Sequence, residues 1–185
     1  MNTEMPKSLG REIFEWVMVI VISAALAFAL DKFIIVNAKI PSASMEPTIM
    51  TGDRLIGNRL AYLNSDPERG DIVIFLYPDN EKELFIKRVI GLPGEWVYID
   101  GSGNIYINDE LLEESYGTET ILNAGLANTD ILLGPDEYFV LGDNRNNSTD
   151  SRFEAVGNIK GDDIVGKAWL RVYPFGDFGL VDNIE

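Results

Sequence analysis

The composition of the chain excludes several classes of function. Its 185 residues include no cysteine and no histidine, which excludes disulfides, thiolate nucleophiles, histidine-based catalytic triads and histidine-ligated metal sites. A net charge of −15 argues against nucleic-acid binding, which requires a basic surface. The hydrophobic content of 46% is sufficient for the packed core of one ordinary domain.

The first long element is an apolar stretch, "WVMVIVISAALAFAL" at residues 16–30, whose one polar interruption is Ser23. This run is shorter than the roughly 20 residues that cross a bilayer core. Adding Ile13 and Phe14 before it and residues 33–36 after it makes a tilted span feasible. The sequence therefore predicts a helix that is long and apolar enough for a membrane.

We predict that residues 13–36 form a retained membrane anchor, preceded by an N-terminal segment at residues 1–12. Two alternatives compete with it. A cleavable signal peptide would use the small-residue pattern Ala27-Phe28-Ala29. A buried core helix would need a helical partner, and no other segment resembles one. Basic residues flank the run on both sides, so charge alone does not give its orientation.

After residue 36, short runs rich in Val, Ile, Tyr, Phe and Trp alternate with Gly, Pro, Asp and Asn, a pattern typical of antiparallel β structure. "VYIDGSGNIYI" at residues 97–107 alternates on both sides of a glycine-rich turn and predicts a hairpin. Residues 109–134 are more polar and irregular, which predicts an excursion or a small lobe. The fold class is mainly β.

The candidate catalytic groups must work without histidine or cysteine. A serine nucleophile would then need a lysine or a carboxylate as its base. Ser42 and Ser44 lie two apart in "IPSASMEPT", just after the apolar run. The acidic residues lie in polar, turn-like stretches, where carboxylates are usually solvated.

Lys87 differs from the other lysines because it lies in the apolar run "LFIKRVIGLPG". In a strand it would share a face with Phe85 and Val89, while Arg88 would point to the other face. Burial on an apolar face would lower the lysine pKa, and a shift from about 10.4 to about 8 needs roughly 3 kcal/mol. Spacing alone favours the plainer interpretation, an exposed lysine or a structural ion pair.

A third segment, "GDNRNNSTDSR" at residues 142–152, is dense in turn formers and hydrogen-bonding groups. Ser148 offers a hydroxyl acceptor for a lysine, and Asp150 and Arg152 can pair and stiffen the loop. An ordinary Asx-rich turn is an alternative. A calcium loop is a weaker one, because Arg145 occupies a position where a ligand is expected.

Together the three segments resemble, in the same order, the nucleophile, lysine and C-terminal boxes of the type I signal peptidases. "RGDIVIF" at residues 69–75 also resembles a strand of that family, and the likeness runs from about Ile13 to Phe175. The resemblance implies one N-terminal transmembrane helix before an antiparallel β-sheet catalytic core. The core would comprise residues 37–94 and 139–185, with a small lobe inserted at residues 95–138.

The resemblance also implies the roles of individual residues. Ser44 would be the nucleophile, Lys87 the general base and Ser148 the hydroxyl that orients the lysine. The Ser42 hydroxyl would join the Ser44 N–H in binding the oxyanion. The charged pairs that would brace the site are Arg88 with Asp143 and Asp150 with Arg152. Substrates would be cut after Ala-x-Ala patterns by shallow pockets whose walls are Ile40, Pro41, Met45, Ile49, Phe85 and Ile86.

The implied partners are preproteins that carry signal peptides, and the lipid bilayer; no nucleic acid, metal or cofactor is expected. We expect a monomer in the cell membrane, spanning it once, with its catalytic domain on the extracytoplasmic side. Two other functions are alternatives: a membrane-tethered β module that binds partners without catalysis, and a specialised peptidase for a narrow set of surface proteins such as pilins. A self-cleaving repressor would need a DNA-binding domain before Ser44, where the apolar run lies instead.

Overall fold

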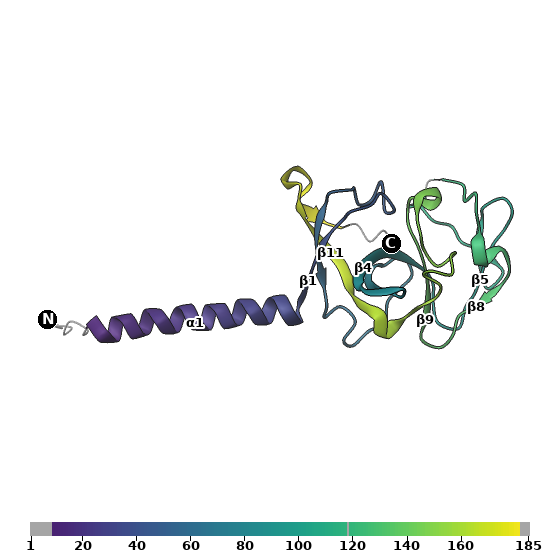
Figure 1. Ribbon diagram of the computed structural model, residues 1–185. Coiled ribbons are helices and arrows are strands. Elements are labelled where there is room, and N and C mark those ends of the chain that lie inside the picture. The colour runs from purple at the N-terminus through teal and green to yellow at the C-terminus, as the bar shows by residue number, and fades with distance from the viewer. Residues whose placement is uncertain (1–8, 118, 182–185) are drawn as a thin grey trace. The chain divides into compact units, whose positions relative to one another are not determined.

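A computed structural model describes residues 9–117 and 119–181 of the chain, and residues 1–8 of the predicted N-terminal segment lie outside it. The structure divides into two units, one ending at Ile35 and one beginning at Val36. The first contains a single long helix and the second contains the β strands (Figure 1).

Helix α1 runs from Leu9 to Phe33 and buries none of its residues. Its 25 residues extend about 37 Å at 1.5 Å per residue, more than the hydrocarbon thickness of a bilayer. An 18-residue window within it has a mean hydropathy of 2.4, so the helix is long and apolar enough to cross a membrane. The alternative interpretation, a helix buried in a soluble core, is therefore wrong.

The helix ends before residue 36, the C-terminal end of the predicted anchor. The helix ends at Phe33, and Ile35 and Val36 instead begin strand β1 (Ile35–Lys39). Val36 is 2% exposed and packs in the core of the β unit. The β-branched pair suits a strand better than a helix end.

The larger sheet has the strand order β1-β2-β11-β3-β4-β9-β10, with β12 paired to β11, and the smaller sheet has the order β7-β6-β5-β8. The remaining strands are β2 (Arg54–Asn58), β3 (Ile72–Tyr77), β4 (Asn80–Gly91), β5 (Trp96–Ile99), β6 (Ile105–Ile107), β7 (Glu110–Leu111), β8 (Ile131–Leu132), β9 (Glu137–Leu141), β10 (Ile159–Lys160), β11 (Ile164–Tyr173) and β12 (Gly179–Leu180). Short 3-10 turns are η1 (Gly125–Asn128), η2 (Arg145–Asn147), η3 (Gly161–Asp163) and η4 (Phe175–Asp177).

The sheets confirm the mainly antiparallel β prediction. Pairs β2–β11, β11–β3, β3–β4 and β4–β9 of the larger sheet are antiparallel. The predicted hairpin is also present, because β5 and β6 pair with Val97 opposite Ile107 and Ile99 opposite Ile105. Asp100 closes the turn by accepting hydrogen bonds from the N–H groups of residues 102 and 104.

The smaller sheet lies within the segment predicted as an inserted lobe, residues 95–138. Its strands run from β5 to β8, and β9 then returns the chain to the larger sheet (Figure 1). Its apolar core is shared, because Ile90 of β4 and Leu141 of β9 pack with Val97 and Ile105. The smaller sheet therefore packs against the part of β4 that follows Lys87 and against β9, which precedes the 142–152 loop.

Candidate active site

Ser44 lies on a tight turn that follows β1. The Glu46 N–H donates to the Ala43 carbonyl at 3.1 Å, and the Ile49 N–H donates to the Met45 carbonyl at 2.9 Å. Met45 and Ile49 are buried in the core beneath the turn. Apolar packing therefore fixes the backbone that carries the Ser44 hydroxyl.

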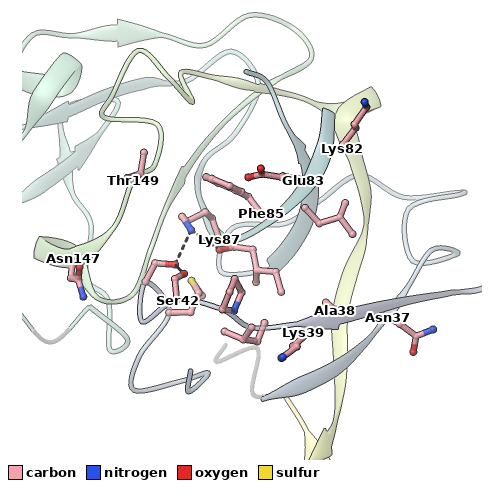
Figure 2. A pocket seen from close by; sticks show the side chains of 16 residues that line it. Asn37, Ala38, Lys39, Ser42, Lys82, Glu83, Phe85, Lys87, Asn147 and Thr149 are labelled. Carbon is pink, nitrogen blue, oxygen red and sulfur yellow. Dashed lines mark hydrogen bonds between the residues drawn. The ribbon is translucent and has the colours of Figure 1, made fainter. Parts of the chain in front are cut away.

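Lys87 lies on β4 opposite Val73 of β3 and is only 4% exposed. Its Nζ donates hydrogen bonds to Ser44 Oγ at 2.9 Å and to the Ile86 carbonyl at 2.9 Å. Nζ also lies 5.1 Å from the centre of the Phe85 ring. Figure 2 shows the Lys87 amine pointing toward the serine hydroxyls at one end of a groove.

The environment of Lys87 makes this lysine easier to deprotonate than an ordinary one. Burial lowers the pKa of Lys87 to about 8, because the charged ammonium loses its hydration. The negative charges of Asp150 and Asp143 act in the opposite direction and raise the pKa. Desolvation is the larger effect, so about a tenth of Lys87 is uncharged at pH 7, far more than for an ordinary lysine.

Arg88, the neighbour of Lys87, pairs with Asp143 in a fully buried, two-bond contact. Arg88 Nε to Asp143 Oδ1 measures 2.9 Å, Nη2 to Oδ2 measures 2.7 Å, and neither side chain is exposed. The Thr48 hydroxyl donates to Asp143 Oδ2 at 2.6 Å. This contact ties the turn that bears Ser44 to the buried pair.

Asp150 and Arg152 form a second buried pair within the 142–152 loop. Arg152 Nε to Asp150 Oδ1 and Nη2 to Oδ2 are both 2.8 Å. Asp150 Oδ2 also accepts the Gly142 N–H at 3.1 Å. In both ion pairs, Arg88 with Asp143 and Arg152 with Asp150, the arginine contacts the carboxylate that the resemblance implied.

Two serines lie beside the Ser44–Lys87 contact. Ser42 Oγ donates to Ser44 Oγ at 3.5 Å, longer than an ordinary bond between hydroxyls. Ser148 Oγ is buried without a hydrogen-bond partner among the described residues. The expected bond from Lys87 to Ser148 is therefore not formed in this structure. Gly142 leaves room for the Ser148 side chain, because a Cβ at position 142 would lie 2.3 Å from Ser148 Oγ.

A groove of about 490 Å³ opens beside the Ser44–Lys87 contact. Five of the predicted pocket walls line it: Ile40, Pro41, Met45, Phe85 and Ile86. The prediction for the sixth wall residue, Ile49, is wrong, because Ile49 is fully buried in the core and does not line the groove. Asn147 and Thr149, from the 142–152 loop, line it as well (Figure 2).

The family described as "Signal peptidase, peptidase S26" matches residues 13–173, which include most of the helix and both residues of the close contact. The chain belongs to this family. It is therefore a serine endopeptidase of the signal peptidase group.

The relatives of this signal peptidase family member match nearly its whole length. "Probable signal peptidase I-2" of Synechocystis sp. is 38% identical over 169 residues, covering 88% of this chain and 74% of the relative. "Signal peptidase I" of Leptolyngbya laminosa is 39% identical and covers 90% and 83%. "Signal peptidase IB" of Staphylococcus aureus (strain MRSA252) is 34% identical and covers 96% and 98%. A crystal structure of a signal peptidase I from Enterococcus faecalis matches 56% of this chain and 97% of that chain, at 32% identity and a TM-score of 0.46.

Sequence reasoning missed several contacts around the candidate site. Asn144 donates its backbone N–H to the Ser44 carbonyl at 3.1 Å and its side-chain amide to the Ala43 carbonyl at 3.0 Å. Arg145 was considered only as an obstacle to calcium binding, but it is buried and donates to the Gly142 carbonyl at 3.1 Å. The density of turn formers in the 142–152 loop was the available signal, but it does not say which chain segment a loop contacts.

Proposed function

We propose that the protein is a membrane-anchored endopeptidase that removes N-terminal signal peptides from exported preproteins, with Ser44 as nucleophile and Lys87 as general base. The carrying observation is the 2.9 Å contact between Lys87 Nζ and Ser44 Oγ, made by a lysine that is almost fully buried. A buried lysine with a lowered pKa can accept a proton near neutral pH, which an exposed lysine does poorly.

The reaction follows from this contact. Neutral Lys87 takes the proton of Ser44 Oγ while the oxygen attacks the scissile carbonyl carbon, which gives a tetrahedral oxyanion and a lysine ammonium. The ammonium returns the proton to the leaving amine as the C–N bond breaks, leaving an ester on Ser44. Lys87 then deprotonates a water molecule that attacks the ester, and Ser44 regains its proton.

The Ser42 hydroxyl and the Ser44 N–H are the proposed oxyanion donors. Because the contact between the two serine hydroxyls is long, Ser42 Oγ–H can turn toward a developing negative charge at little cost. Donors of this kind contribute about 3–4 kcal/mol in other proteases.

The two buried ion pairs have a proposed electrostatic role. Asp143 and Asp150 both raise the pKa of Lys87, which would keep the base protonated. Pairing with Arg88 and Arg152 places a compensating positive charge beside each carboxylate. Ser148 remains the proposed partner of the ammonium that forms during the reaction, because its hydroxyl is buried and has a free lone pair.

The groove suits an extended peptide. Strand β4 pairs with β3 along residues 84–88, but its pairing with β9 begins only at Arg88. The other edge of β4 before Arg88 is thus unpaired among the described strands, and a substrate strand can add there. Phe85 and Ile86 on this strand, with Ile40 and Met45 opposite, would leave room only for small side chains near the cleaved bond.

The remaining assignments complete the proposal. Helix α1 would cross the cell membrane once, with residues 1–12 in the cytoplasm and the β unit on the extracytoplasmic side, where signal peptide cleavage sites emerge. The β unit would act as a monomer. Its catalytic core would comprise residues 37–94 and 139–185, and residues 95–138 would form the inserted lobe.

A peptide with alanine at P3 and P1 tests this function. Wild-type protein in detergent is expected to cut it after the P1 alanine. Lys87→Ala is expected to be inactive, because Lys87 is the only base hydrogen-bonded to Ser44 Oγ among the residues that the structure describes. Lys160→Ala removes an exposed lysine from β10 and serves as the matched control. Mass spectrometry of the products identifies the cleaved bond.

The outcomes separate the competing functions. Cleavage by wild type and Lys160→Ala but not by Lys87→Ala supports the assignment. Equal cleavage by all three proteins would eliminate Lys87 as the base. No cleavage by any of them, with the β fold retained, would favour the non-catalytic module or a narrow substrate range.

The pH dependence of cleavage gives a second expected result. Only neutral Lys87 can accept the Ser44 proton, so kcat/KM should rise with pH and level off above about 8, where burial places the lysine pKa. Well below that pKa, the rate should change about tenfold per pH unit. A profile measured between about pH 6 and 10 that stays flat would contradict a lysine base.

A further inference from the structure

A four-residue segment of the inserted lobe, Glu114–Gly117, lies against the catalytic loop, and we call it the lobe strap. Its Glu114 carboxylate bonds to both terminal nitrogens of Arg145, with 2.8 Å between Nη2 and Oε2. The Arg145 side chain is 1% exposed and that of Glu114 is 14% exposed. Gly117 leaves the space for this pair, because a Cβ there would lie 2.5 Å from Arg145 Cζ.

Arg145 in turn holds the part of the loop that touches the nucleophile. Its Nε donates to the Gly142 carbonyl at 3.1 Å. Gly142 packs directly on the Ser44 backbone, since a Cβ at this glycine would lie 2.4 Å from the Ser44 carbonyl oxygen. The same carbonyl accepts the Asn144 N–H at 3.1 Å. Residues 142–145 therefore fix the peptide plane that follows the nucleophile.

The lobe strap also reaches the neighbour of the base. The Tyr116 ring stacks on the Arg88 guanidinium, with 4.1 Å between Arg88 Cζ and the ring centre. Arg88 adjoins Lys87 on β4 and is fully buried with Asp143. One short segment of the lobe thus contacts Arg145, which holds the catalytic loop, and Arg88, the neighbour of Lys87.

We propose that Glu114 is a positioning residue: through Arg145 and Gly142, the inserted lobe sets the position of the Ser44 hydroxyl relative to Lys87. This inference rests on the proposed function of Ser44 and Lys87. Removing the carboxylate leaves the buried Arg145 guanidinium without its countercharge, which is costly, so we expect its side chain to move toward other acceptors or water. The Gly142 carbonyl then loses its donor, and the loop can shift against Ser44. Misplacement of a reacting group by about 1 Å lowers the rate by up to about 100-fold.

The test compares two adjacent acidic residues in the full-length protein in detergent. Glu114→Ala removes the partner of Arg145, while Glu113→Ala removes an equal charge at an exposed position. We expect kcat for the alanine-P3, alanine-P1 peptide to fall about tenfold in Glu114→Ala, with KM within about twofold of wild type. The midpoint of the pH profile should stay near 8, because the burial of Lys87 is unchanged. Glu113→Ala should match wild type in all three measurements.

A change in stability alone would not lower kcat tenfold in a protein that stays folded. Loss of folded protein lowers the apparent kcat only in proportion to the fraction that is unfolded. Thermal unfolding of each variant measures that fraction. If Glu114→Ala does not fold, Glu114→Gln decides the matter: it keeps the side-chain size and one acceptor, so a smaller loss of kcat is expected. Equal kcat in the Glu114 and Glu113 variants would overturn the inference, as would a loss confined to KM. Failure of wild type itself to cleave would overturn the proposed function, and this inference with it.

Discussion

Ser44→Ala is expected to lower the cleavage rate by roughly 10³-fold or more, to the level of the uncatalysed reaction plus whatever the oxyanion donors alone provide. The substitution removes only the hydroxyl group, whose oxygen, Oγ, Lys87 Nζ contacts at 2.9 Å. Hydrolysis without it would require water to attack directly, with no covalent intermediate. Single-turnover cleavage at enzyme excess measures such low rates.

Two serine variants make the Ser44 result specific. Ser102→Ala, in an exposed turn of the smaller sheet, should behave as wild type. Ser42→Ala should keep a residual rate, because one oxyanion donor is removed while the nucleophile stays; a loss of about 10²–10³-fold is expected. A Ser44→Ala protein that retains more activity than Ser42→Ala would reject Ser44 as the nucleophile.

Lys87→Met is expected to be inactive and yet more stable than wild type at pH 6. The folded-state pKa of Lys87 is about 8, below the ordinary 10.5. Below pH 8 the lysine is charged in both states, so the folded state bears the full cost of a buried ammonium, about 3 kcal/mol. Between pH 8 and 10.5 only the unfolded state binds the proton, so wild-type stability rises with pH. Methionine fills a similar volume and carries no charge.

Chemical denaturation at several pH values measures this effect. The stability gained by Lys87→Met should be about 1–3 kcal/mol at pH 6, since the lost hydrogen bonds to Ser44 and Ile86 offset part of it. The gain should shrink as pH rises toward 10.5. Destabilisation at pH 6 that does not vary with pH would mean that the Lys87 ammonium is well solvated or well paired in the folded protein.

Much of this architecture could be predicted from local patterns. The alternation around Lys87 placed the lysine beside Phe85, and the structure confirms that neighbourhood, with the amine 5.1 Å from the ring centre. The hairpin at residues 97–107 was likewise visible because its turn and its period-two pattern are both local. Such features depend on residues a few positions apart, which a sequence displays directly.

Features that depend on long-range packing could not be predicted in this way. Spacing alone favoured an exposed or ion-paired Lys87, because its contact with Ser44 joins residues 43 positions apart in the chain. Ile49 was taken for a pocket wall from the family resemblance, yet it is fully buried in the core. Glu114 gave no signal, since it is one of several acids in an irregular stretch whose partner lies 31 positions away.

The edge of β4 that is unpaired among the described strands also affects the tendency of the folded protein to aggregate at high concentration. An open strand edge accepts any extended chain, including a misfolded copy of the same protein, and exposed edges are common starting points for aggregation. Charged side chains at a strand edge discourage such pairing, and Lys82 and Glu83 occupy the exposed end of β4. An enzyme that must admit polypeptide strands cannot cover this edge, so its protection against self-association depends on charge and on how briefly each strand remains bound.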